Sequence, residues 1–357
     1  MVGAAFSAIS FSILIKKLQE TVNLVAIKSG SMTEKPAPQG TDDASKVKRL
    51  EQFRIYYNHT IHPELLRMER KRIRLLRLLF FSTLFMAGVL LFEFYIDILA
   101  LTLLLAIPLG VYISYLLYRI QRFRLTFKPN VVSLILDFID DGMNFDPAHP
   151  LKYDPKREIG KDRFQKSQIF ATKAPYYAGE DFISGRIGEM DFEMSELHVK
   201  ELSPVENRLD EVFKGVFMHA TFPEETEGRM IIWPRRLRQF HTKAIKEFTW
   251  NKGLNQDKEV NNQKFKELFL TYATEDTHVE SILSEPMQDA IVQYCASTGK
   301  EIYMSFIDRE IYAAVSEDKD ILEPNLFRSN LSFELVKGFF EDINLLLRIA
   351  EDFDQTH

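Results

Sequence analysis

The chain has 357 residues and a formal net charge of −6. This acidic balance gives no support for a nucleic-acid partner, which would normally require a basic face. Cys295 is the one cysteine, so the sequence excludes an internal disulfide framework and a cysteine-based zinc site, and it fits a reducing compartment.

The first 45 residues are expected to form a flexible tail. An apolar stretch at 4–15 has no preceding cation, so it does not read as a secretory signal. It is also too short to cross about 30 Å of hydrocarbon at about 1.5 Å per residue. Prolines and glycines between 29 and 45 then indicate a linker.

An amphipathic helix is predicted over 46–60, because apolar residues recur at three- and four-residue steps from Leu50 to Ile61. The pair His62-Pro63 is expected to interrupt it, since proline disfavours a helical conformation in the residue before it. A second helix should then run toward the apolar block that follows. We assign residues 46–74 to cytoplasmic amphipathic and juxtamembrane helices.

The apolar block at 75–118 predicts a hairpin of two transmembrane helices. As one helix it would measure about 65 Å, roughly twice the hydrocarbon thickness. Two spans, Leu75 to Phe92 and Ile98 to Tyr118, fit if the acidic segment Glu93–Asp97 forms the turn, because a carboxylate is costly at the bilayer centre. The alternative is a buried hairpin of a soluble protein, but such helices show a polar face, and residues 78–92 show none.

Basic residues flank both predicted spans, whereas the turn between the spans carries only acids. By the positive-inside rule, both ends of the hairpin should face the cytoplasm. The same cations could instead form a specific lipid-headgroup site, and that alternative stays open. The set comprises Arg67, Arg70, Lys71, Arg72, Arg74, Arg77, Arg119, Arg122, Arg124 and Lys128.

Residues 119–166 are predicted to form a juxtamembrane helix followed by a connector. Pro129 is expected to open the helix, because proline suits a first helical position. The helix should end at Asp141-Gly142, where glycine favours a stop. The segment from Gly142 to Lys166 contains several prolines and glycines and is expected to be extended.

Residues 167–357 are predicted to form a cytoplasmic α+β domain. Hydrophobic alternation gives neighbouring strands at 182–187, 190–202, 212–222 and 230–233. The change of apolar parity along the second strand predicts a bulge near Ser195. The third strand is apolar at both parities, so it should be central. Its Gly215 is expected to leave room between Phe213 and Phe217 for a covering helix.

The second half of this domain adds further elements. We predict a strand at 266–272, a helix at 286–297 that buries Cys295, a hairpin of 301–306 with 310–315, and a terminal helix beginning after Ser332. Because strands and helices are segregated, the fold class is α+β: a two-helix transmembrane hairpin followed by a mostly antiparallel sheet domain with flanking helices.

Acidic residues concentrate around the first hairpin of the domain and could bind a cation or a basic partner. Alternating acids are also what the solvated face of an antiparallel sheet normally shows. The candidate interaction face comprises Glu180, Asp181, Glu189, Asp191, Glu193 and Glu196. The histidines His198 and His219 could approach each other on neighbouring strands, but two histidines do not define a metal site.

The sequence contains no phosphate-binding loop, zinc-protease motif or nucleophile elbow. We therefore predict no catalytic, cofactor-binding or metal residue and no cofactor.

Several stretches together resemble the bacterial domain of unknown function 3137 family. They are Leu50–Tyr57, Tyr177–Asp181, Gly185–Val199, Phe213–Phe217 and Ile302–Phe306, with the paired spans. The resemblance runs over roughly 46–353 and implies a bacterial inner-membrane protein of this two-span plan, with no assigned activity. The first 45 residues lie outside it, so a physiological start near Met32 stays open.

These observations predict a membrane-tethered cytoplasmic interaction or regulatory module, whose partners are the lipid bilayer and another protein. The alternatives are a membrane-associated enzyme with a dispersed active site and a lipid-headgroup-binding domain. A deep pocket with converging acids and histidines would favour the enzyme, and a basic concave face toward the bilayer would favour the lipid binder. An exposed apolar or acidic sheet face would favour the interaction module.

Overall fold

The computed structural model describes residues 41–356, apart from 97–98, 143–149, 204–207, 223–227, 237–238 and 318–321. Most of the predicted N-terminal tail and part of the turn between the apolar helices therefore lie outside the described residues. The chain divides into two compact units, Met1–Arg49 and Leu50–His357. The first is described only from Thr41, where helix α2 begins. All that follows concerns the second unit.

The N-terminal side of the hairpin is helical from α2 (Thr41–Tyr56) through a π-helical turn, η1 (Tyr57–Ile61), into α3 (His62–Ile96). The predicted break at Pro63 is therefore wrong. The N–H of His62 donates to the carbonyl of Tyr57, five residues back. The wider turn immediately before Pro63 accommodates a residue that cannot donate a backbone hydrogen bond, so the chain stays helical.

The return helix, α4 (Leu99–Gly142), is likewise longer than predicted. It ends at Gly142 as expected but passes through both Pro108 and Pro129, so Pro129 does not open a new helix. Phe127 and Val131, on either side of this proline, are buried in the core of the unit. Their packing offsets the hydrogen bond that proline removes.

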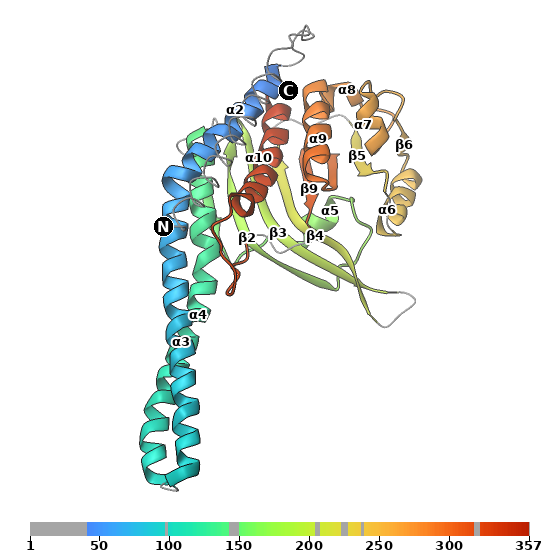
Figure 1. The fold of residues 1–357 in the computed structure, drawn as a ribbon. Coiled ribbons are helices and arrows are strands. Elements are labelled where there is room, and N and C mark those ends of the chain that lie inside the picture. Colours follow the sequence, from blue (N-terminus) through green and yellow to red (C-terminus); the bar gives the residue numbers. More distant parts are fainter. Residues whose placement is uncertain are drawn as a thin grey trace, which may run out of the picture. The chain divides into compact units, whose positions relative to one another are not determined.

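Helices α3 and α4 form the long hairpin in Figure 1. Both are long and apolar enough to cross a membrane, and little of their apolar part is buried within the protein. Phe80 and Phe81, for example, are 64% and 63% exposed. A buried core helix would not leave such rings uncovered.

A sheet of nine strands follows, and all its pairings are antiparallel, with the order β1-β2-β3-β4-β9-β8-β5-β7-β6. The predicted α+β class is confirmed. The strands are β1 (Lys152–Asp154), β2 (Tyr176–Ile187), β3 (Met190–Leu202), β4 (Leu209–Thr221), β5 (Arg229–Pro234), β6 (Leu254–Asn255), β7 (Phe269–Ala273), β8 (Ile302–Ile307) and β9 (Glu310–Ser316).

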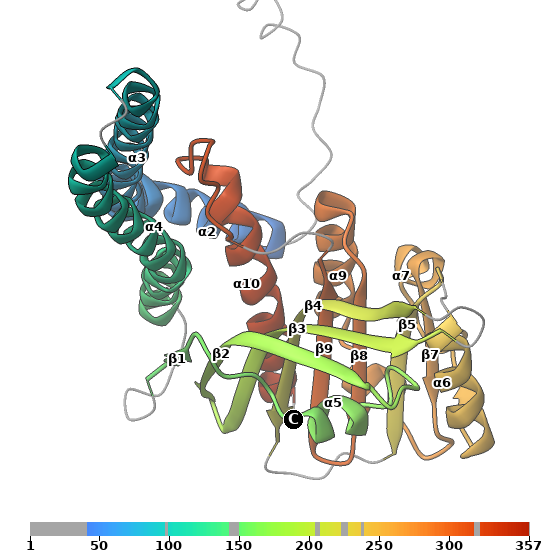
Figure 2. The ribbon, with the colours of Figure 1, turned by 90° about the horizontal axis from the view of Figure 1, so that it is seen from below.

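Helices cover both faces of this sheet (Figure 2). One core cluster joins one face to α9 (Glu285–Thr298), α10 (Phe333–Thr356) and the C-terminal part of α4. The other cluster lies under α5 (Lys161–Lys166) and α6 (Gln239–Trp250). Two short helices, α7 (Gln263–Leu268) and α8 (Val279–Ile282), complete the described elements.

The two covered faces explain the parity change along β3. Met194 belongs to the first cluster and Leu197 to the second, while β3 pairs with β4 without interruption between them. The predicted bulge in β3 is therefore wrong. The irregularity lies in the partner strand β2, between Glu180 and Ile183, where Asp181 adopts a φ of +58°.

The central position predicted for β4 is confirmed, but the expected role of Gly215 is not. Gly215 has a φ of +145°, and a Cβ there would lie 2.0 Å from the carbonyl oxygen of Val315. The close neighbour is thus the backbone of the adjacent strand β9, with which Gly215 pairs through Ser316. Phe164 of the covering helix α5 does pack against both Phe213 and Phe217, with ring centroids 6.1 Å and 5.2 Å apart, but the atoms nearest to a Cβ at Gly215 are backbone atoms of Val315, Ser316 and Glu317.

Other differences are local. Residues 266–268 end helix α7 and only 269–273 form a strand, so the predicted strand at 266–272 began too early. The predicted extended connector contains both β1 and α5, and helix α6 was not predicted. The core also runs across the predicted segment boundaries: residues from 46–74, 119–166 and 167–357 share the first cluster.

Candidate functional site

The ten predicted membrane-flanking cations separate into two kinds. Arg72 and Lys128 are buried, and the other eight are exposed. The buried pair would be costly to desolvate without acidic partners. Each of the two has such partners, and these contacts explain its position.

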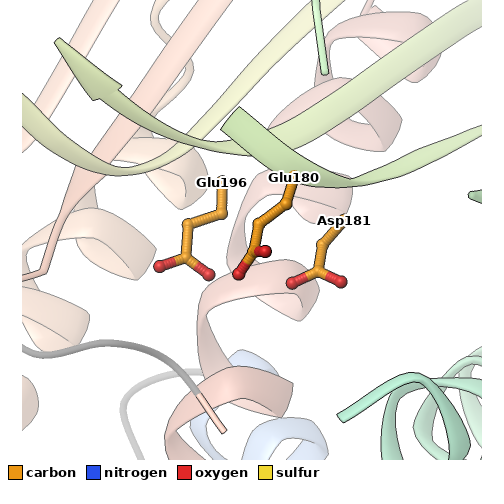
Figure 3. A group of neighbouring side chains, drawn as sticks. All are labelled: Glu180, Asp181 and Glu196. Atoms are coloured by element: carbon orange, nitrogen blue, oxygen red, sulfur yellow. The ribbon is translucent and has the colours of Figure 1, made fainter. Parts of the chain in front are cut away.

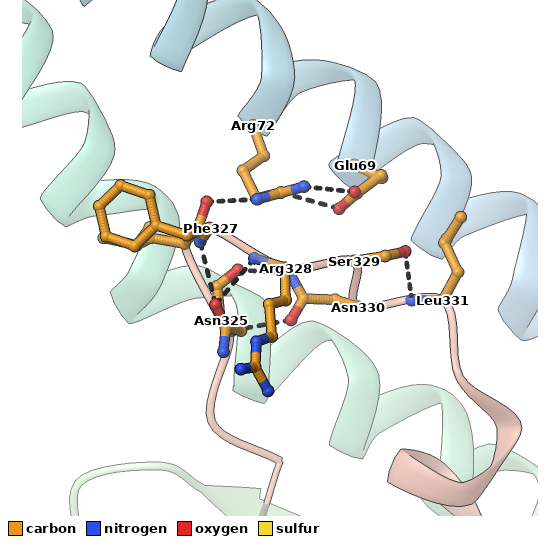
Figure 4. A network of polar contacts seen from close by, with 9 residues as sticks. Glu69, Arg72, Asn325, Phe327, Arg328, Ser329, Asn330 and Leu331 are labelled. Atoms are coloured by element: carbon orange, nitrogen blue, oxygen red, sulfur yellow. Dashed lines mark hydrogen bonds and ion pairs between the residues drawn. The ribbon is translucent and has the colours of Figure 1, made fainter.

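Arg72 is held by the helix that carries it and by a distant loop (Figure 4). Its Nε lies 2.9 Å from a carboxylate oxygen of Glu69, one turn earlier in α3. Its Nη1 donates to the carbonyl of Leu326, in the loop before α10. Arg72 therefore fastens that loop to the hairpin.

Lys128 joins the hairpin to the sheet. Its Nζ lies 2.6 Å from Glu180, 2.7 Å from Asp181 and 2.8 Å from Glu196. Figure 3 shows these three carboxylates turned toward one another from β2 and β3. Tyr153 of β1 donates its hydroxyl hydrogen to Asp181 as well. Three of the six residues of the predicted acidic face thus contact Lys128, which belongs to the predicted basic set.

Burial raises the pKa of Asp181 and of Glu196, and the attraction of Lys128 offsets this only in part. Their oxygens and one of Glu180 lie within 4.8 Å of one another, close enough to share a metal ion. The ammonium group already lies at hydrogen-bonding distance from all three. A cation of the protein itself therefore satisfies this cluster, and we assign no metal to it.

A groove lies between α3 and α4, directly beside the apolar part of the hairpin. It encloses about 600 Å³, and the described residues that line it include five cations and no acid. Four of the cations follow the i, i+3, i+4, i+7 spacing that places side chains on one helix face. The cationic lining residues are Arg67, Arg70, Lys71 and Arg74 of α3 and Arg119 of α4.

The remaining walls of the groove are apolar or aromatic. Leu75, Leu78 and Leu116 line the side nearest the apolar helices, together with Tyr112 and Tyr115. Arg67 is also 3.5 Å from Glu64, but its side chain remains 81% exposed. A concave surface with cations at one end and aliphatic side chains at the other complements an amphiphile with an anionic head.

The rest of the predicted acidic face lies elsewhere. Glu189 and Asp191 are exposed at the β2–β3 turn. Glu193 lies on the opposite face of β3 from Glu196, beneath α5, and accepts from Arg163. The six acids therefore do not form one interaction surface.

A second cavity, of about 420 Å³, has Glu193, Arg163 and His219 in its lining. Arg163 Nη1 lies 2.7 Å from His219 Nδ1, and since Arg can only donate, Nδ1 is the acceptor. Nε2 then donates to Glu310. Both ring nitrogens are occupied, so His219 is a structural link between α5, β4 and β9. His198 contacts Glu211 instead, and the two histidines are not brought together.

The sequence identifies the ten cations, but it does not show which of them are buried and which line the groove. The spacing of the four cations on α3 predicts that they share one helix face. Arg119 lies opposite them on the return helix α4, and the sequence does not show that it faces them. Glu69, one turn before Arg72 on α3, is a local partner, but the sequence does not show that Arg72 is buried, because the Leu326 carbonyl reaches it only through tertiary packing.

Comparison with known proteins gives a family. Residues 211–355 match the family described as "Protein of unknown function (DUF3137)". The match is narrower than the resemblance inferred from the sequence: it contains His219 and the loop before α10, but not the basic groove. No curated protein matches the chain.

One solved structure that is similar is titled "crystal structure of the mycobacterial trehalose monomycolate transport factor A, TtfA". It shares 10% identity, with 55% of this chain and 88% of that chain covered, at a TM-score of 0.26. This likeness is too low to carry an argument. The family match over residues 211–355 confirms, for this part of the chain, the resemblance inferred from the sequence.

Proposed function

We propose that this protein is a membrane-tethered regulatory module that binds anionic phospholipid in the basic groove at the base of its hairpin. In this proposal α3 and α4 cross the bacterial inner membrane, and both ends of the hairpin face the cytoplasm. The single observation that carries the proposal is the convergence of five cations above an aliphatic wall, with no acid among the described lining residues.

The lipid proposal rests on the positive charge of the groove and on its position next to the apolar part of the hairpin. A cation close to an anionic leaflet strengthens membrane binding by on the order of 1 kcal/mol. Cations that converge on one phosphate select an anionic headgroup better than cations scattered around a helix do. The tyrosines Tyr112 and Tyr115 suit the headgroup level, where aromatic residues concentrate. The leucines can contact the first carbons of the acyl chains.

The alternatives receive less support. An enzyme that used the histidine of the second cavity as its general base is not supported, because both ring nitrogens of His219 are engaged. A module that recognises a protein through an open sheet face would need such a face, whereas helices cover both sides of the described sheet. A protein partner that responds to the lipid-bound state remains part of the proposal.

The test compares two pairs of substitutions that remove equal charge. Arg70→Gln with Arg74→Gln removes two cations from the groove. Arg122→Gln with Arg124→Gln removes two exposed cations of α4 that do not line it. The full chain in detergent is titrated with short-chain phosphatidylglycerol and with phosphatidylcholine, and bound lipid is counted by native mass spectrometry.

We expect the wild type and the α4 control to retain phosphatidylglycerol in preference to phosphatidylcholine, and the groove variant to lose that preference. Equal loss in both variants would mean nonspecific attraction and would overturn the site. Glycerol phosphate is added as a competitor. Displacement of the lipid by this soluble phosphate at similar concentration would show that the acyl contacts contribute nothing and that the ligand is not a lipid.

A further inference from the structure

The loop between β9 and α10 places one large aromatic ring in an exposed position. Phe327 is 87% exposed, although most large apolar residues of the sheet domain are buried. In Figure 1 this loop, drawn in red below α10, descends beside the hairpin. An isolated exposed aromatic residue needs no explanation, so the argument rests on how the loop is built and on what lies next to the ring.

Two asparagines determine the shape of the loop. The side-chain oxygen of Asn325 accepts from the backbone N–H groups of Phe327, at 2.9 Å, and Arg328, at 2.8 Å. Asn330, which is buried, accepts from the Asn325 N–H at 2.7 Å and donates to the Asn325 carbonyl at 3.0 Å. The phenyl ring takes no part in these bonds. The loop therefore presents the ring rather than folding around it.

The hairpin fixes the position of this loop. Arg72, paired with Glu69, donates to the Leu326 carbonyl, as Figure 4 shows. Tyr57 donates to the Leu331 carbonyl at 2.8 Å from the other end of the loop. These contacts join the loop to η1 and to the first turns of α3. Phe327 is thus held at a defined height along the hairpin.

Phe327 lies beside the apolar part of α3. Phe327 shares the walls of a shallow cavity with Phe80, Phe81 and Arg77 of α3. Phe80 lies roughly 8 Å beyond Leu75, at about 1.5 Å per residue, and it is itself mostly exposed. The ring of Phe327 therefore continues an apolar surface that begins on the hairpin, and the exposed cation Arg328 follows it.

We propose that the loop 325–330 is a third membrane contact, in which Phe327 inserts among lipid chains at the cytoplasmic interface. This inference rests on the membrane crossing proposed above. Lipid is the occupant that the geometry favours, because the surface is continuous with rings of the span and is bordered by Arg77 and Arg328. The contact would hold the sheet domain at a fixed tilt instead of leaving it attached through the hairpin alone.

Tryptophan fluorescence can test this in the full chain reconstituted into liposomes. Trp250, which is 90% exposed, is replaced by Phe, and Trp233, which is fully buried, remains as a constant background. Phe327→Trp is then introduced. The control variants carry Phe85→Trp in the same background, for a ring within the span, or retain Trp250, for a ring in water. Quenching is measured with lipids spin-labelled near the headgroup or deep in the chain, and with aqueous acrylamide.

We expect Phe327→Trp to be quenched by the shallow lipid label at least three times more strongly than Trp250, and to be protected from acrylamide relative to it. Phe85→Trp should respond to the deep label. If Phe85→Trp responds but Phe327→Trp is quenched only by acrylamide, the loop inference is overturned while the membrane crossing stands. Protection from both quenchers would place another protein surface on the ring and would also overturn it. If Phe85→Trp does not respond, the crossing itself fails.

Discussion

The ring of Phe53 in α2 lies face to face with that of Phe340 in α10, with centroids 3.9 Å apart and planes inclined by 9°. Phe138 of α4 packs against both rings, at 5.2 Å and 5.7 Å. Three helices from distant parts of the sequence therefore meet at one aromatic cluster. The amphipathic helix predicted over 46–60 uses its apolar face to pack within the protein.

Phe53→Ala should accordingly destabilise the protein by about 3–5 kcal/mol, because it removes a fully buried ring and leaves a cavity. The check is chemical denaturation of the full chain in detergent. Ile55→Ala, two residues away and exposed, is the matched control and should change stability by less than about 0.5 kcal/mol. Equal effects of the two substitutions would contradict the packing described.

Lys128→Met should leave three carboxylates facing one another without their shared cation. Loss of one partner from a buried ionic cluster typically costs about 3–5 kcal/mol, so we expect a clear fall in the thermal midpoint of the sheet domain. Lys156→Met, at an exposed position, serves as the control. Adding Asp181→Asn and Glu196→Gln to Lys128→Met should restore part of the loss, and no restoration would argue against an electrostatic origin.

The pH dependence of stability should have opposite signs at two carboxyl groups. Burial raises the pKa of Asp181, so its contribution to stability is full below its ordinary pKa of about 4 and is lost as the pH rises through the raised value. Asp181→Asn removes that loss. The variant should therefore gain stability relative to wild type as the pH rises from about 4 toward neutrality.

Glu193 provides the opposite case. Burial works against its charge, but the neighbouring His219 ring and the charge of Arg163 hold the pKa of this carboxyl below its usual value. Its contribution is present above about 4 and is lost as the pH falls through the lowered value. Glu193→Gln should thus lose stability relative to wild type as the pH rises toward about 4 and then show no further change. Thermal midpoints measured from pH 3 to 7.5 test both signs, and parallel curves for the two variants would refute the assignment.

Gly215→Val should destabilise the protein by at least about 1–3 kcal/mol, because a side chain at this φ meets the backbone of β9. Denaturant unfolding measures the effect. Gly338→Ala in α10 is the control: a Cβ there has no neighbour within 4 Å, and replacing a helical glycine by alanine normally stabilises by up to about 1 kcal/mol. A neutral valine at 215 would mean that β4 and β9 do not pair as described.

Both ends of the hairpin should face the cytoplasm. Alkaline phosphatase fused after Asp141 or at the C-terminus should be inactive, since this reporter works only outside the cytoplasm, whereas a fusion inserted in the turn between α3 and α4 should be active. Green fluorescent protein at the same two cytoplasmic positions should fluoresce. Phosphatase activity at either of them would reverse the proposed orientation.

The sequence was sufficient for the fold class and for most strands, because hydrophobic period and turn glycines are local signals. It failed where tertiary packing overrode a local rule. Pro63 is tolerated because a π-helical turn precedes it, and Pro129 is tolerated because Phe127 and Val131 are buried on either side of it. The parity change at Ser195 reads as a bulge in one strand, but it reflects a sheet covered on both faces.

The candidate site was only partly predictable for the same reason. Charge pattern identifies the cations of α3, but it cannot show that Lys128 turns toward Asp181 and Glu196. Nor does any sequence signal single out Phe327, whose position depends on the Arg72 contact to Leu326. Long-range pairing decides which members of a charged set remain available for a ligand.

The shared core of hairpin and sheet has a consequence for the order of assembly. Ile135 of α4 and Ile343 of α10 belong to the same buried cluster, but the ribosome makes the second of them roughly 10–40 s after the first, at about 5–20 residues per second. If the hairpin crosses the membrane as proposed, it can enter the bilayer within that interval, while the C-terminal part of α4 is still uncovered. Helix α10 is the last described element to be made, so it is the one that closes the fold, and a chaperone that shields α4 until then would act on this protein after insertion and before completion.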